Sequence, residues 1–237
     1  MSVNTKYRTE ETEIMDDFSL QSEELIGALD QIASINQLLG GNKLTLHGIK
    51  QLLKKIDTSK TITIADIGCG NGDMLRMLAK YGKKHNLQFK LIGIDANAFT
   101  IDYAKKLSKN YPNIEYVYMD IFSEDFHQLH YDIVLCTLTL HHFTTNQIAA
   151  VMEILNRNAS IGIVINDLHR SKLAYRLFEL ISVVFNLNRM SRNDGLISIL
   201  KGFKKNELEQ FSKKLNLKNY SINWKWAFRY QWIITKI

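Results

Sequence analysis

Residues 62–73 constrain this chain most: an apolar, β-branched run ends in an acid, and glycines follow at every second position. The run 62–67 is typical of a buried strand. Gly68, Gly70 and Gly72 come after it, and residues 74–80 have the composition of a helix start. Glycine lets the backbone approach a ligand closely, and a helix start offers unpaired N–H groups. The order strand, glycine turn and helix therefore predicts a nucleotide-binding cradle.

The rest of the chain alternates the patterns of strands and helices, which is typical of an α/β protein with a parallel sheet. The only proline, Pro112, breaks the chain before the third strand. The C-terminal residues predict an antiparallel hairpin that closes the sheet. The strands are expected at residues 61–67, 89–94, 114–119, 132–137, 161–165, 218–224 and 228–235.

Helices are expected between these strands and ahead of the first one. Apolar residues recur at helical spacing over residues 14–39, and a second short helix is expected at 46–56. We expect residues 1–57 to form a helical cap and 58–237 the core, with a helical insert at about 172–202. Within that insert we expect a helix at 172–185 and irregular structure after it. The core helices are expected at about 73–84, 98–109, 144–156 and 204–215.

Composition limits the function classes. The 237 residues are 46% hydrophobic, which suits one sizeable α/β core. Two cysteines give no disulfide framework and have no metal-ligand spacing, so we expect a reducing, cytoplasmic location and no metal. No apolar run is long enough to span a bilayer. The net charge of +6 would suit nucleic acid, but a lysine-rich composition explains it, and the acidic N-terminal part could pack against the basic C-terminal part. We therefore do not expect nucleic acid as the partner.

The motif around the glycines carries a family resemblance. The stretch Asp66-Ile67-Gly68-Cys69-Gly70-Asn71-Gly72 has the spacing G-x-G-x-G, whereas the dinucleotide fingerprint is G-x-G-x-x-G. It resembles the first motif of the class I S-adenosylmethionine (SAM) methyltransferases, of the small-molecule type. The resemblance covers about residues 60–167. It implies a Rossmann-like seven-stranded sheet, mostly parallel with an antiparallel C-terminal hairpin, helices on both faces and an N-terminal helical cap.

The same resemblance implies which residues bind SAM. Asp95 ends the second strand, where a carboxylate can accept both ribose hydroxyls, although NAD enzymes place an acid similarly. In Tyr118-Met119-Asp120-Ile121, the Asp120 carboxylate would accept from the adenine amine and the Ile121 N–H would meet a ring nitrogen. Asp66 lies near the expected amino-acid end of SAM, and Cys136 and Thr137 beside its methionine part. Cys136 could equally be a core residue. The expected cofactor-binding set is Asp66, Gly68, Cys69, Gly70, Asp95, Ala96, Asp120, Ile121 and Thr137.

Three histidines are candidates for a general base. His141 and His142 follow the fourth strand, and His169 follows the fifth. A free imidazole titrates near 6.5, so it can accept a hydroxyl proton at neutral pH. Adjacent loop residues cannot usually both face a ligand, and both histidines could instead brace the loop. Arg170 and Arg192 could hold an acidic or carbonyl substrate, or could be solvated surface residues.

Absent motifs narrow the acceptor. Residues 136–139 contain no proline, whereas amide and amino-nitrogen methyltransferases often carry an Asn/Asp-Pro-Pro-aromatic motif there, and neither cysteine fits cytosine C5 methylation. The sequence therefore predicts a SAM-dependent methyltransferase that methylates a phenolic or hydroxyl oxygen of a small molecule. A macromolecular (RNA or protein) methyltransferase and a non-catalytic SAM-binding protein remain alternatives, and homodimerisation is left open.

Overall fold

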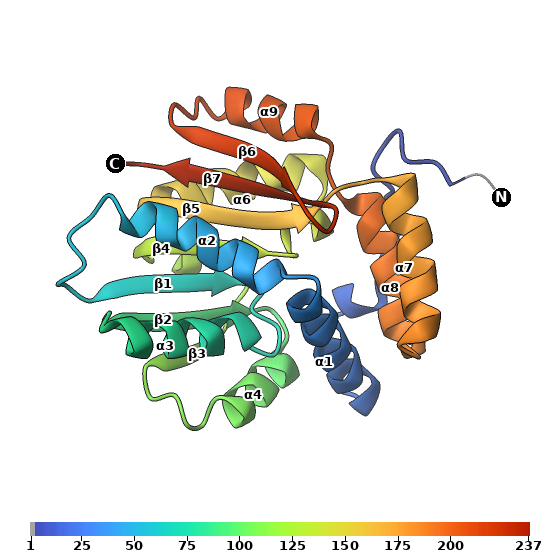
Figure 1. Ribbon diagram of the computed structural model, residues 1–237, viewed down its shortest axis with the longest axis horizontal. Coiled ribbons are helices and arrows are strands. Elements are labelled where there is room, and N and C mark those ends of the chain that lie inside the picture. Colours follow the sequence, from blue (N-terminus) through green and yellow to red (C-terminus); the bar gives the residue numbers. More distant parts are fainter. Residues whose placement is uncertain (1–2) are drawn as a thin grey trace.

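A computed structural model describes residues 3–237, and within them the strands form one seven-stranded sheet. The strand order is β3-β2-β1-β4-β5-β7-β6. β3, β2, β1, β4 and β5 are parallel, whereas β7 is antiparallel to β5 and β6 to β7. This confirms the predicted Rossmann-like architecture with its C-terminal hairpin (Figure 1). The strands are β1 Ile62–Ile67, β2 Phe89–Asp95, β3 Ile114–Tyr118, β4 Tyr131–Thr137, β5 Ala159–Leu168, β6 Tyr220–Lys225 and β7 Arg229–Thr235.

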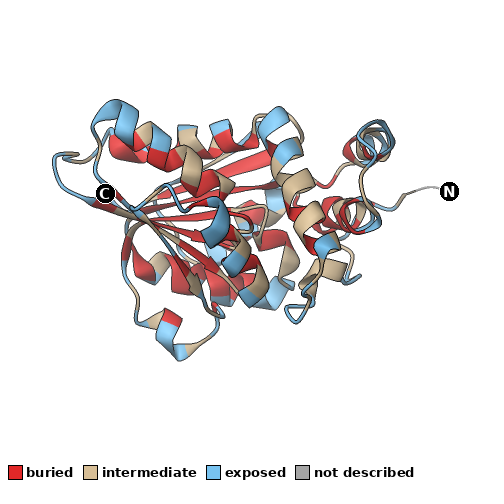
Figure 2. Cartoon of the chain, turned by 90° about the horizontal axis from the view of Figure 1, so that it is seen from below, coloured by how far each residue is buried: buried red, intermediate tan, exposed pale blue. Residues whose placement is uncertain are grey.

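Helices cover both faces of this sheet because alternate strand residues are apolar on each face. In β4, Ile133 and Leu135 pack on the face that α2, α3 and α4 cover, and Val134 and Cys136 pack on the face that α5, α6 and α9 cover. The buried strands lie between helices with exposed outer sides (Figure 2). These helices are α2 Gly41–Leu53, α3 Asp73–His85, α4 Ala98–Leu107, α5 Glu124–His127, α6 Thr145–Asn158 and α9 Lys205–Lys214.

The remaining helices stand beyond the carboxyl ends of the parallel strands (Figure 1). They are α1 Glu23–Leu38, α7 Lys172–Val184 and α8 Arg189–Lys201, with the short 3-10 turns η1 Ile14–Asp16 and η2 Leu140–His142. α8 packs against both α1 and α7. Together these elements form a wall over the sheet edge where α/β proteins bind their ligands.

Helix α8 occupies the stretch expected to be irregular, so that expectation was wrong. Its sequence breaks the helical pattern with polar residues and Gly195, but Asn188 caps its first turn by accepting from Ser191 N–H at 2.7 Å. A side chain at position 195 would overlap the Phe178 ring of α7. The glycine therefore lowers helix propensity and, at the same time, lets α7 and α8 pack closely.

Helix α2 lies within the predicted cap but packs on β5 and β7 of the sheet. Gly48 makes this possible, since a Cβ there would come within 2.6 Å of Val164. The expected boundary at residue 57 stays a prediction. α1 is the helix of this region that stands at the sheet edge.

Candidate active site

The glycine turn joins β1 to α3 at the centre of the sheet edge. Gly68, Gly70 and Gly72 all have positive φ angles, of +66°, +51° and +77°. A side chain at position 72 would also overlap the Tyr116 hydroxyl. Both constraints require glycine here, and the turn borders the space above β1.

Asp95 is fixed against this turn. Its Oδ2 accepts from Gly70 N–H at 3.1 Å, and its Oδ1 accepts from Asn97 N–H at 3.0 Å. Burial raises the pKa of Asp95 despite these hydrogen bonds. Each oxygen keeps a free lone pair. The carboxylate can therefore accept two ribose hydroxyls of a nucleoside on this side of the turn.

Asp66 is a buried acid beneath the same space. Only 3% of its surface is exposed, and Oδ1 has no hydrogen-bond partner among the described residues. Burial, and then the charges of Asp73 and Asp95, raise the pKa of Asp66 well above its usual range. A cationic ligand group nearby would stabilise the ionised carboxylate, so the site fits the ammonium or sulfonium of SAM.

The other predicted cofactor residues lie in the same wall. Asp120 is exposed, and its Oδ1 accepts from Phe122 N–H at 2.9 Å, which leaves Oδ2 for a ligand. The Thr137 hydroxyl lies 3.2 Å from that of Thr45 on α2. Burial raises the pKa of the Cys69 thiol well above its usual range, so it stays protonated.

One cavity of about 820 Å³ brings these groups together. Its wall contains all the predicted cofactor residues, all three candidate histidines, and apolar side chains from α1, α7 and α8. Cys136, for which the sequence left open a place beside SAM or in the core, is a fully buried core residue. From the cofactor set, the cavity is lined by Asp66, Gly68, Cys69, Gly70, Asp95, Ala96, Asp120, Ile121 and Thr137.

His141 forms a buried pair with Asp167 of β5. The Nδ1 atom lies 2.7 Å from Asp167 Oδ1, and the imidazole is 2% exposed. Burial alone would raise the pKa of Asp167, but the charge and hydrogen bond of His141 bring it below its usual value. An ionised Asp167 keeps the proton on Nδ1, so Nε2 is the free acceptor. Nε2 has no hydrogen-bond partner among the described residues.

His142 is paired differently, although its ring centroid is only 4.3 Å from that of His141. Its Nδ1 lies 2.7 Å from Asp16 Oδ1 in η1. Burial opposes its charged form, but the hydrogen bond to Asp16 and the charges of Glu13 and Asp16 raise its pKa above the ordinary value. His142 therefore holds its proton more strongly than a free histidine does. Both adjacent histidines line the cavity, contrary to the sequence expectation, because the 3-10 turn η2 places them side by side.

His169 faces the cavity from the far end of the sheet edge. Its Nδ1 accepts from the Trp224 indole N–H at 3.1 Å. A neutral His169 then carries its proton on Nε2, so that atom cannot act as an acceptor. Burial and the neighbouring Lys204 and Arg170 lower its pKa. This arrangement favours His141 over His169 as a base.

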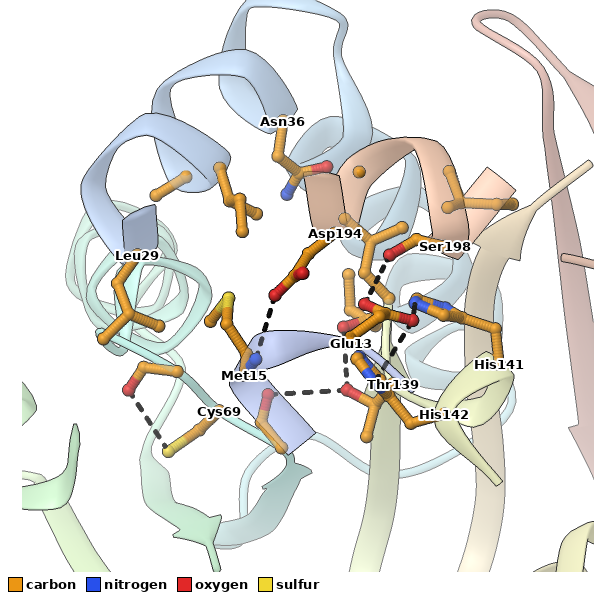
Figure 3. Close-up of a pocket in the computed structure, with 18 of the residues that line it drawn as sticks. Glu13, Met15, Leu29, Asn36, Cys69, Thr139, His141, His142, Asp194 and Ser198 are labelled. Carbon is orange, nitrogen blue, oxygen red and sulfur yellow. Dashed lines mark hydrogen bonds and ion pairs between the residues drawn. The ribbon is translucent and has the colours of Figure 1, made fainter. Parts of the chain in front are cut away.

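Glu13 lies where the two histidines meet (Figure 3). Its Oε1 is 4.0 Å from His141 Nε2 and 3.6 Å from His142 Nδ1, and Ser198 donates to its Oε2 at 2.7 Å. One ligand atom from each of Glu13, His141 and His142 lies within 4.8 Å of the others, so these residues could hold a metal ion. However, the Lys201 ammonium already lies 3.2 Å from Glu13 and 2.9 Å from Asp16. Lys201 thus supplies positive charge to this cluster.

The arginines named from the sequence lie elsewhere. Arg170 is fully buried, forms an ion pair with Glu207 at 2.6 Å and does not line the cavity. Arg192 is exposed on α8 and also lies outside the cavity wall. The sequence reasoning missed the cavity residues Glu13, Asp16 and Arg229, and the partners Asp167 and Lys201. Asp167 could have been found from the sequence, because it follows the fifth apolar run in the way that Asp95 and Asp120 follow the second and third runs.

Comparison with known proteins agrees with this geometry. The plantazolicin methyltransferase BpumL in complex with S-adenosylhomocysteine (SAH) superposes with a TM-score of 0.66 and 20% identity, over 88% of this chain and 89% of that one. The magnesium protoporphyrin IX methyltransferase ChlM from Synechocystis PCC 6803, with bound SAM, gives 0.56 and 13% over 86% and 84%. At these identities the likeness shows the fold alone.

The sequence comparison matches part of the chain. A model described as a methyltransferase domain matches residues 64–162. Protein 235L of Invertebrate iridescent virus 6, which carries a methyltransferase designation, is 33% identical over 98 residues, or 41% of this chain. The match spans about a third of that relative's length, 34%. Residues 64–162 therefore resemble a methyltransferase domain.

Proposed function

We propose that this chain methylates a hydroxyl oxygen of a small, largely apolar molecule with SAM as the methyl donor. The observation that carries the proposal is the Asp167–His141 pair. His141 lines the cavity that also contains Asp95 and the glycine turn, and its Nε2 has no hydrogen-bond partner among the described residues. The apolar lining from α1 and α7 supports a small-molecule acceptor.

The cofactor residues would act by position and charge. The turn and Asp95 would hold the ribose, Asp120 the adenine, and Asp66 would balance the positive charge. SAM supplies an electrophilic methyl group and leaves as the neutral thioether SAH. Alignment of the acceptor oxygen with that methyl group accounts for much of the rate in such a displacement.

His141 would take the acceptor proton. Asp167 orients the ring and stabilises the imidazolium that forms when Nε2 accepts the hydroxyl proton. Three carboxylates, Glu13, Asp16 and Asp167, surround Lys201 and the two histidines.

The test measures SAH formation from SAM with a panel of hydroxylated aromatic and aliphatic acceptors. We expect His141→Gln to lower kcat by about 100-fold or more, since a general base contributes that much, while SAH affinity stays unchanged. His47→Gln, an exposed histidine of α2 outside the cavity, is the matched control. Undiminished turnover in His141→Gln would exclude this residue as the base. Absence of both SAM binding and turnover in the wild type would remove the proposed function.

A further inference from the structure

Arg229 is a buried arginine without a hydrogen-bonding role in the fold. It begins β7, is 3% exposed and lines the cavity. Its Nε and Nη1 groups are buried and have no hydrogen-bond partner among the described residues. Burying a polar donor without a partner is unfavourable, and arginine is almost never fully buried unless it is paired. The fold alone does not account for this guanidinium.

Asp167 is the nearby charge that favours the charged form of Arg229, but the hydrogen bonds of its oxygens go to other groups. Oδ1 accepts from Leu168 N–H at 2.7 Å and pairs with His141 Nδ1, and Oδ2 accepts from His141 N–H at 3.2 Å. Burial lowers the pKa of Arg229 to about 10, so the group stays charged at neutral pH. Arg229 is thus a buried cation whose Nε and Nη1 donors have no acceptor among the described residues.

The strand that carries Arg229 is not one of those that carry the predicted ribose and adenine residues. The glycine turn, Asp95 and Asp120 follow β1, β2 and β3, whereas β7 lies three strands from β1 on the other side. At about 4.8 Å per strand, the backbones of β1 and β7 are about 14 Å apart along the sheet edge. The guanidinium carbon lies 3.1 Å from the position that a Cβ of Gly41 at the start of α2 would take. Leu168, Phe228 and the α7 residues Phe178 and Ile181 line the cavity with it. A guanidinium with unpaired donors in a cavity that also has these apolar side chains fits an apolar molecule with one anionic group.

We propose that Arg229 binds a carboxylate of the methyl acceptor, so that the acceptors are apolar molecules carrying an acid group. This inference rests on the proposed function. The same chemistry could come from the methionyl carboxylate of SAM, and the sheet order favours the acceptor. Arg229 is then a specificity determinant, distinct from the base His141.

The experiment uses benzoate and its neutral counterpart benzamide as probes, with calorimetry on the SAH complex. We expect the wild type to bind benzoate about tenfold more tightly than benzamide, the value of one charge-assisted hydrogen bond. Arg229→Met should abolish this preference and leave SAH affinity unchanged. Arg229→Lys should retain part of it, because the charge remains without the planar fork. Arg192→Met, on the exposed side of α8, is the matched control and should behave as the wild type.

Two results would overturn the assignment. A benzoate preference that is absent from the wild type, or that survives in Arg229→Met, would show that Arg229 binds no carboxylate. A tenfold loss of SAH affinity in Arg229→Met, with unchanged affinity for 5′-methylthioadenosine, would assign Arg229 to the cofactor instead. Titration of benzoate and benzamide without SAH tests carboxylate binding by Arg229 even if the protein binds no SAM. Failure of the inference and failure of the proposed function are therefore distinguishable. Arg229→Gln repeats the test if the methionine variant folds poorly.

Discussion

At the scale of single residues, the two adjacent histidines have opposite roles because their partners differ. Asp167 holds the Nδ1 proton of His141 and leaves Nε2 free, whereas Asp16 makes His142 retain its proton. Lys201 adds a fixed positive charge beside both Asp16 and Glu13. The chemistry of each ring is thus set by residues far away in the sequence.

The His142–Asp16 pair makes stability depend on pH. The folded pKa of His142 lies above its ordinary 6.5, so its contribution is complete below about pH 6.5 and is lost as pH rises through the raised value. The folded pKa of Asp16 is lowered from 3.8, so its contribution is present above that pH and is lost on acidification. We therefore predict that Tm falls between about pH 6 and 9 more steeply in the wild type than in His142→Asn.

Thermal unfolding over this pH range in several buffers checks the prediction. His130→Asn removes an exposed histidine and should leave the wild-type slope intact. If Tm changes with pH in the same way in the wild type and in His142→Asn, the His142–Asp16 pair makes no pH-dependent contribution to stability.

At the scale of elements, the N-terminal segment connects η2 to α8. The Arg8 guanidinium donates to the carbonyls of Lys201 at 2.6 Å, His141 at 2.7 Å and Phe143 at 2.8 Å. Asp194 of α8 accepts from the N–H groups of Ile14 and Met15, both at 2.9 Å. The segment thereby fixes the turn that carries both histidines.

We predict that Arg8→Met lowers the free energy of unfolding by about 2 kcal/mol, because three buried carbonyls lose a charged donor. For a chain of this size, that corresponds to a Tm about 4–8 °C lower. kcat should also fall, since η2 loses its support. Lys6→Met, an exposed change in the same segment, is the control for thermal unfolding and turnover. An Arg8→Met protein with wild-type Tm would contradict the supporting role.

The elements also show how far the sequence predicts this protein. The sheet and most helices were predictable because each strand is a compact apolar run between turn residues, and the acids that follow β1, β2 and β3 could be found from that order alone. The pairs His141–Asp167 and His142–Asp16 were not, since 26 and 126 residues separate their members. α8 was missed because its burial comes from packing on α1 and α7 rather than from a periodic apolar face. Arg229 carries no local signal at all, since one arginine at a strand start is ordinary.

At the scale of the whole molecule, the sheet edge divides into two halves. β1, β2 and β3 present the glycine turn and the acids Asp66, Asp95 and Asp120, whereas β4, β5 and β7 present the histidines and Arg229. α1, α7 and α8 enclose both halves in one cavity (Figure 1). None of the helices within residues 3–237 has the length and apolar character that crossing a bilayer requires.

The account depends on SAM binding in the first half of that cavity. Calorimetric titration with SAH tests this most directly, and Asp57→Ala, at an exposed loop acid, serves as the control. We predict one SAH per chain, with affinity at least about tenfold weaker in Asp95→Ala and unchanged in Asp57→Ala. A wild type that binds no SAH, or an Asp95→Ala protein that binds it as tightly as the wild type, would contradict the account.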